Sequence, residues 1–85
     1  MNTIVTQIQT NARNDFHIRL MDTLIDKNYT QLRLSEEIGV DKKRVNDWVH
    51  GKCFPDLWNF IAICAVLGVS ADYLLFGKDK VNDEI

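Results

Sequence analysis

Two short segments separated by one glycine constrain the fold of this 85-residue chain most strongly. Thr30 and Asp41 each stand where a side chain can cap the N-terminus of a helix. Gly39 lies between them, and glycine commonly ends a helix because it adopts the left-handed conformation at little cost. The sequence therefore predicts two consecutive helices, over residues 31–38 and 42–50, joined by a tight turn.

The second of these helices has an apolar face and a polar face. At roughly 100° per residue, Val45, Trp48 and Val49 share one face, and we expect them in the core. The opposite face carries Lys43, Asn46, Asp47 and His50, with Lys42 and Arg44 on its flanks. Three consecutive basic residues are unfavourable at the positive end of a helix dipole. Their presence there therefore favours contact with an anion. The pattern predicts a helix-turn-helix, a unit that presents its second helix to the DNA major groove.

An amphipathic helix precedes this unit. Its apolar stripe consists of Phe16, Leu20, Met21, Leu24 and Ile25, and Asn28 ends it. Residues 1–12 fit either a loose arm or a continuation of the same helix, because Ile4, Ile8 and Ala12 recur at a spacing of four.

Two more helices are predicted after the unit. A helix over residues 57–67 follows Pro55 and ends at Gly68. Ser70 caps a short fifth helix through Leu75, and a further glycine ends it. Because no strand pair, repeat or linker is evident, we expect an all-α fold, a compact domain of five helices.

Length and composition fit one small domain. The apolar fraction of 46% and the charged fraction of 26% are ordinary for a soluble globular protein. We expect the domain to cover residues 13–77, after an N-terminal arm or helix extension over residues 1–12 and before a frayed, charged tail over residues 78–85. No apolar run reaches the roughly 18 residues that cross a bilayer, and no signal peptide is evident, which indicates a cytoplasmic protein.

The sequence supports no metal site, cofactor or enzymatic activity. Cys53 and Cys64 do not form a metal-binding pair, and we expect both to be reduced, structural thiols. His17 and His50 have no ligand partners at useful spacing, and we expect His17 on the surface of the first helix. Neither a phosphate-binding glycine loop nor a nucleophile–histidine–acid pattern is present.

Charge is unevenly distributed along the chain. The net charge of −2 and the pI of about 5.5 argue against a general polyanion binder. Residues 41–52 nevertheless carry a balance of +2, and the remainder carries −4. One basic element on an acidic body suits an oriented, specific contact with phosphate. Taken alone, Lys42, Lys43 and Arg44 would also fit a solvated helix start.

These features together resemble the lambda-repressor-like, Cro/C1-type helix-turn-helix family. The matching positions keep the order and spacing of that family over about residues 16–77: Thr30, Gln31, Leu34, Ser35, Gly39, Val40, Val45, Trp48, Gly51, Lys52, Pro55, Ile63, Leu67, Gly68, Val69, Ser70, Asp72, Tyr73 and Leu74. The resemblance implies a DNA-binding domain, usually homodimeric, that acts as a repressor or regulator of transcription in bacteria or their phages.

The resemblance also implies roles for single residues. Gln31 falls at a position that touches the phosphate backbone, and His50 and Lys52 fall where the helix end and the following loop meet phosphate. Lys42, Lys43 and Asp47 fall where the family reads base edges. The predicted double-stranded DNA site therefore consists of Gln31, Asp41, Lys42, Lys43, Arg44, Asn46, Asp47, His50 and Lys52.

Two departures from the family pattern affect this site. Asp47 is costly near phosphate unless it accepts a hydrogen bond from cytosine N4 or pairs with a lysine. Val49 stands where the family commonly has an acid, so the ion pair that this acid makes to the first helix is expected to be absent.

The helix over residues 57–67 lacks a polar face, because only Asn59 is polar. The residues that need a cover beyond the core are Trp58, Ile61, Ala62, Ala65 and Val66. A second subunit or the arm can provide that cover, and we favour a homodimer contact. The alternative function is a protein-interaction module on the same fold, antitoxin-like or the partner of a regulator, with weak or no DNA binding. The acidic pI and Asp47 favour that alternative.

Overall fold

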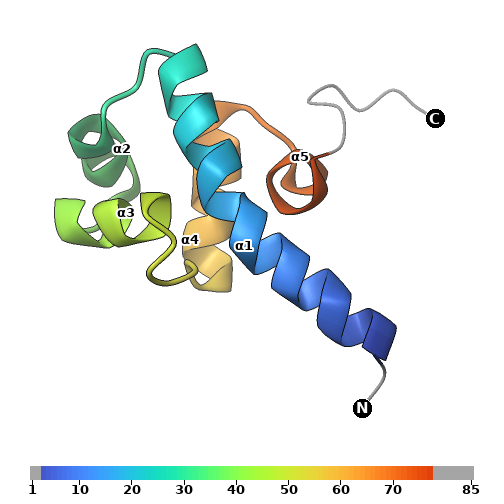
Figure 1. The fold of residues 1–85 in the computed structure, drawn as a ribbon. Coiled ribbons are helices and arrows are strands. Elements are labelled where there is room, and N and C mark those ends of the chain that lie inside the picture. The colour runs from blue at the N-terminus through green and yellow to red at the C-terminus, as the bar shows by residue number, and fades with distance from the viewer. Residues whose placement is uncertain (1–2, 78–85) are drawn as a thin grey trace.

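The computed structural model describes residues 3–77, with side chains from Asp15 onward. Its five helices are α1 (Thr3–Asp26), α2 (Gln31–Ile38), α3 (Lys42–Val49), α4 (Leu57–Leu67) and α5 (Ala71–Phe76). No strand occurs within this range, so the all-α prediction is confirmed. Figure 1 shows α2 and α3 together on one side of the molecule, with α5 and the first half of α1 on the other. The predicted tail, residues 78–85, lies outside the described residues.

Local capping signals set most helix boundaries. The Thr30 hydroxyl accepts a hydrogen bond of 3.0 Å from the N–H of Arg33, and the Ser70 hydroxyl accepts one of 3.0 Å from the N–H of Tyr73. Asp41 is an exception to the prediction: it occupies the N-cap position of α3, but its carboxylate makes no capping bond. The N–H of Arg44 instead bonds the main-chain oxygen of Asp41 at 3.0 Å, which satisfies the donor without the side chain.

Every helix contributes at least one buried apolar side chain to the core. Its buried apolar residues are Phe16, Leu20, Leu24, Leu34, Val45, Trp48, Val49, Phe60, Ile63, Leu67, Val69 and Leu74. Two members of the predicted α1 stripe are not among them: Met21 is 38% exposed and Ile25 is 71% exposed. The inward face of α1 includes Thr23 instead, which is buried. Its hydroxyl donates a hydrogen bond of 2.8 Å to the Arg19 carbonyl, so this buried polar group has a partner within its own helix.

The first half of α1 extends away from the other helices (Figure 1). Because α1 begins at Thr3, residues 3–12 continue the first helix and do not form a loose arm, which decides between the two alternatives for the N-terminal segment. This helix does not cover the outer face of α4, because Trp58 remains 77% exposed. None of the helices in the described range combines the length and apolarity that crossing a bilayer requires.

Candidate nucleic-acid interface

The turn between α2 and α3 is fixed by two hydrogen bonds to one carbonyl. The N–H groups of Gly39 and Val40 both donate to the oxygen of Ser35, at 2.9 and 3.0 Å. Gly39 has a φ of +80°, which glycine adopts without the strain that a Cβ brings. Val40 packs half-buried against the core beneath the turn. The angle at which α3 leaves α2 is therefore set by the backbone.

Three buried side chains attach α3 to the rest of the domain. Val45, Trp48 and Val49 are each at most 2% exposed, which confirms the predicted inner face of this helix. Val49 packs among apolar residues where the family commonly has an acid. Since these anchors leave the helix little freedom to rotate, the opposite face is presented to solvent in one orientation.

The nine residues predicted to bind DNA lie at the start of α2, along α3 and in the turn after it. Six of them are exposed: Asp41, Lys42, Lys43, Arg44, His50 and Lys52. The other three, Gln31, Asn46 and Asp47, are half-buried. The structure thus brings the set to one surface, and the role of each residue stays a prediction.

Lys43 and Asp47 form an ion pair one helical turn apart. Lys43 Nζ lies 3.3 Å from Asp47 Oδ2, and the two side chains are 85% and 20% exposed. Asp47 thus pairs with a lysine, which is one of the two ways in which an acid on this face can avoid repulsion by phosphate. Exposed pairs of this kind contribute little to stability, so Lys43 can exchange its partner for a nucleic-acid group at low cost.

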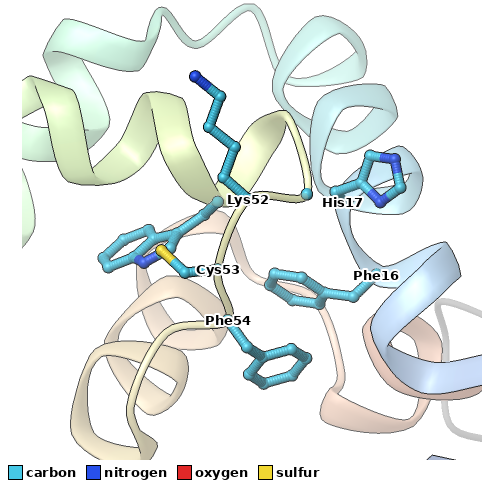
Figure 2. A pocket seen from close by; sticks show the side chains of 7 residues that line it. Phe16, His17, Lys52, Cys53 and Phe54 are labelled. Carbon is cyan, nitrogen blue, oxygen red and sulfur yellow. The ribbon is translucent and has the colours of Figure 1, made fainter. Parts of the chain in front are cut away.

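Hydrogen bonds hold three further side chains of this surface, those of Gln31, Asn46 and His50. Asn46 Nδ2 donates to Gln31 Oε1 at 3.0 Å, across the two helices. His50 Nδ1 lies 2.8 Å from the Asn46 carbonyl oxygen, which holds its ring at the end of α3. The N–H of Lys52 donates to the Asp47 carbonyl at 2.9 Å. Figure 2 shows the Lys52 side chain extending away from the aromatic residues below it.

A second polar cluster lies on the exposed side of α2. The Tyr29 hydroxyl donates to Glu37 Oε1 at 2.8 Å, and Arg33 Nε donates to Glu37 Oε2 at 3.0 Å. The hydrogen bond to Glu37 raises the pKa of Tyr29, and the same bond, together with Arg33, lowers the pKa of Glu37. The bond to Glu37 also raises the pKa of Arg33, whose guanidinium stands 4.1 Å from the Tyr29 ring centroid. None of these residues was predicted to form a site.

Two α1 residues make long-range contacts that the sequence did not predict. His17 is half-buried, not on the surface as predicted, because its ring packs against Gly51. Arg19 donates from Nε to the Leu74 oxygen at 2.9 Å and from its terminal nitrogen to the Leu75 oxygen at 2.8 Å. Both contacts join positions far apart in the chain, so no pattern of neighbouring residues in the sequence indicates them.

The two thiols and the acidic groups do not assemble into a ligand site. Cys53 is exposed in the loop after α3, and partial burial in α4 raises the pKa of the Cys64 thiol. Across residues whose side chains are described, no group of three or more His, Cys, Asp or Glu could hold a metal ion. What this surface offers chemically is a projecting helix with basic and amide groups.

Comparisons with known proteins identify relatives of this chain. A Helix-turn-helix family model matches residues 20–74, more than half of the chain. The SPbeta prophage-derived uncharacterized HTH-type transcriptional regulator YonR of Bacillus subtilis (strain 168) is 34% identical over 68 residues, which cover 80% of this chain and 63% of that protein. The HTH-type transcriptional activator BcrR of Enterococcus faecalis is 28% identical over 68 residues, which cover 80% of this chain and 33% of that protein.

The chain thus spans about a third of one of these relatives and less than two thirds of the other. No solved structure matches it.

Proposed function

Because the chain belongs to the Cro/C1-type helix-turn-helix family of DNA-binding transcription regulators, we propose that it binds a specific DNA sequence with α3 in the major groove. The observation that carries this proposal is the first turn of α3, where Lys42, Lys43 and Arg44 are all exposed and no acid is present. Cations there oppose the helix dipole, and an approaching phosphate relieves that repulsion. The family consists of regulators rather than enzymes, in agreement with the sequence prediction.

Base reading falls to the exposed face of α3. Lys43 is the second residue of the helix, and its long side chain can donate to guanine O6 and N7. Asp47, once released from Lys43, can accept a hydrogen bond from cytosine N4. Because Lys43 and Asp47 are one turn apart, they would read neighbouring base pairs, with Asn46 between them on the same face.

Phosphate contacts come from the residues around this face. Gln31 precedes it on α2, and His50 and Lys52 follow it in the turn after α3. Such contacts carry no sequence information but fix the register of the reading helix on the duplex. Lys42, Arg44 and Asp41 stand at the flanks of α3 and complete the proposed surface.

We further propose a homodimer formed through α4. Trp58 is 77% exposed and Ile61 is 47% exposed, and Ala65 beside them is also exposed. A two-fold axis through Trp58, Ile61, Ala62, Ala65 and Val66 would pair identical apolar patches, as isologous dimers do. Two copies of α3 about 34 Å apart would then match an inverted repeat with half-sites one DNA turn apart.

The proposed action is repression in the cytoplasm, by occupation of a promoter. Occupation requires only DNA binding, which the residues described above can supply. YonR is named a regulator and BcrR an activator, so the direction of control is tested separately. A reporter gene behind the selected site should fall in expression when the protein is present, and a rise would make the protein an activator.

A protein-interaction module on the same fold is the second candidate function. Two observations favour it: the uncovered Trp58 side chain and the acidic pI of about 5.5. In this alternative the α4 face binds a different protein, and DNA binding is weak or absent.

Selection of DNA from a random pool, followed by titration of the selected duplex, tests the proposal against this alternative. We expect the selected duplex to bind at least about 10³-fold more tightly than unrelated DNA at physiological salt. Binding that is equally weak on both duplexes would contradict a sequence-specific regulator and support the interaction module.

A further inference from the structure

The glycine that follows α3 is in contact with α1 through one side chain. A Cβ placed on Gly51 would lie 3.1 Å from both Cγ and Nδ1 of His17 and 3.3 Å from its Cδ2, and these are the three nearest heavy atoms. Gly51 also has a φ of +76°. A side chain at this position would therefore be strained by the backbone conformation and would press on the imidazole ring. Figure 2 shows His17 beside the turn that carries Lys52.

Few internal contacts hold this turn in place. The Gly51 N–H reaches the Trp48 oxygen at 3.3 Å, which is long for such a bond, and Lys52 is tied only through its N–H to Asp47. A hollow of about 70 Å³ lies beneath the turn, lined by Phe16, His17, Trp48, Gly51, Lys52, Cys53 and Phe54. From the α1 side, the packing of His17 on Gly51 restrains the turn itself, and the ring contact of Phe16 with Phe54, at a centroid distance of 4.6 Å, restrains the loop just after it.

The shape of the His17 ring, rather than its hydrogen bonding, makes this contact. Its Nδ1 is buried and has no hydrogen-bond partner among the residues described. A buried polar atom without a partner costs free energy, so an apolar ring of similar shape should pack there at least as well. A small side chain at the same position would leave the turn unsupported.

We propose that His17 is a positioning residue for the DNA contact of Lys52, an inference that rests on the proposed function. The ring supports Gly51 from α1, and the next residue along the turn carries the cation assigned to phosphate. In the absence of the ring, the turn samples other backbone conformations. The main chain of Lys52 then no longer has one fixed position from which its side chain can reach a phosphate. The side chain of His17 itself need not touch the nucleic acid.

Amide hydrogen exchange of the free protein tests the structural half of this proposal. In His17→Ala, exchange at Lys52 should rise several-fold, while exchange in α5 and the middle of α2 stays as in wild type. His17→Phe should keep the wild-type rate, because it keeps a flat ring. Ile18→Ala serves as the matched control, since Ile18 is the neighbouring α1 residue and is 53% exposed. Unchanged exchange at Lys52 in His17→Ala would overturn the proposal.

DNA titration at several salt concentrations tests the functional half, with each variant held at a temperature where circular dichroism shows it folded. His17→Ala and Lys52→Ala should each lower the salt slope by about one, and the double variant should bind like Lys52→Ala alone. His17→Phe should keep the wild-type slope. Fully additive losses would overturn the positioning role, whereas a wild type that ignores DNA sequence would remove the proposed function instead.

Discussion

The side-chain amide of Asn46, in the middle of α3, donates a hydrogen bond of 3.0 Å to Oε1 of Gln31, the first residue of α2. This bond joins the two helices of the helix-turn-helix at their polar edges, opposite the buried anchors of α3. It uses the oxygen of Gln31 and leaves the amide nitrogen of Gln31 as a donor. Gln31 can therefore orient the reading helix and donate to a phosphate at the same time.

Gln31→Glu should separate these two roles. The carboxylate still accepts from Asn46, so the Tm should stay within a few degrees of wild type. The variant loses the amide donor and gains a negative charge, so binding should weaken by about 1.5–3 kcal/mol on selected and unrelated DNA alike. Circular dichroism melting and titration of both duplexes measure this. Unchanged DNA affinity would show that Gln31 does not face phosphate.

Arg19→Met should destabilise the domain by about 1.5–3 kcal/mol, because charge-assisted hydrogen bonds to two carbonyls at the end of α5 are lost. Arginine also suits this place because a cation complements the C-terminal end of a helix dipole. The matched control is Arg33→Met on α2, whose side chain is 55% exposed and whose ion pair should therefore contribute much less to stability. Urea unfolding measures both. Equal losses for the two variants would contradict a special role for Arg19.

We expect the Tyr29–Glu37 hydrogen bond to stabilise the fold only within a pH window, because each partner titrates at one end of it. The lowered pKa of Glu37 means that the contribution is present above the ordinary glutamate pKa of 4.5 and is lost as pH falls through the folded value. The raised pKa of Tyr29 means that it is present below 10.0 and is lost as pH rises through the folded value. The Glu37 carboxylate is solvent-exposed, so added salt should weaken the effect.

Absorbance at the tyrosinate band, followed in a Tyr73→Phe background, reports the titration of Tyr29 alone. Its pKa should exceed 10.0 and should return toward that value in Glu37→Gln, whose amide is a weaker acceptor. An unaltered titration in Glu37→Gln would mean that another group raises the tyrosine pKa.

Trp58→Glu should convert the proposed dimer to a monomer, because a carboxylate at the centre of an apolar interface is left without a partner. Sedimentation at micromolar concentration measures the change. Ile25→Glu on α1 is the matched control, since Ile25 is 71% exposed and lies on the outward face of a different helix. If the wild type is a monomer, the proposed interface does not exist. If only Ile25→Glu breaks the dimer, the interface lies on α1 and not on α4.

The sequence predicted those features that depend on neighbouring residues. The bounds of α2 and α4 agree with the prediction because Thr30, Gly39 and Gly68 act within one helical turn. The inner face of α3 agrees because an apolar triplet at helical spacing has one way to be buried.

Contacts between distant segments were not predictable in this way. The sequence contains no local signal that Arg19 bonds the end of α5 or that His17 supports the turn after α3, because each depends on how helices meet. Met21 and Ile25 belong to the apolar stripe predicted for α1 but remain outside the buried core, because the helices packed on α1 cover a stripe narrower than its apolar face. The Gln31–Asn46 bond likewise follows from the angle between α2 and α3.

Titration of the selected duplex with Lys43→Ala and Lys52→Ala, at two salt concentrations, tests the central claim that α3 reads DNA sequence. Lys43→Ala should cost about 1–3 kcal/mol on the selected site and relax its sequence preference, because a base contact is lost. Lys52→Ala should weaken binding on all sequences and lower the salt slope by about one, because a phosphate contact is lost. If Lys43→Ala instead weakens all duplexes equally and leaves the preferred sequence unchanged, Lys43 does not read bases and the proposed recognition by α3 is wrong.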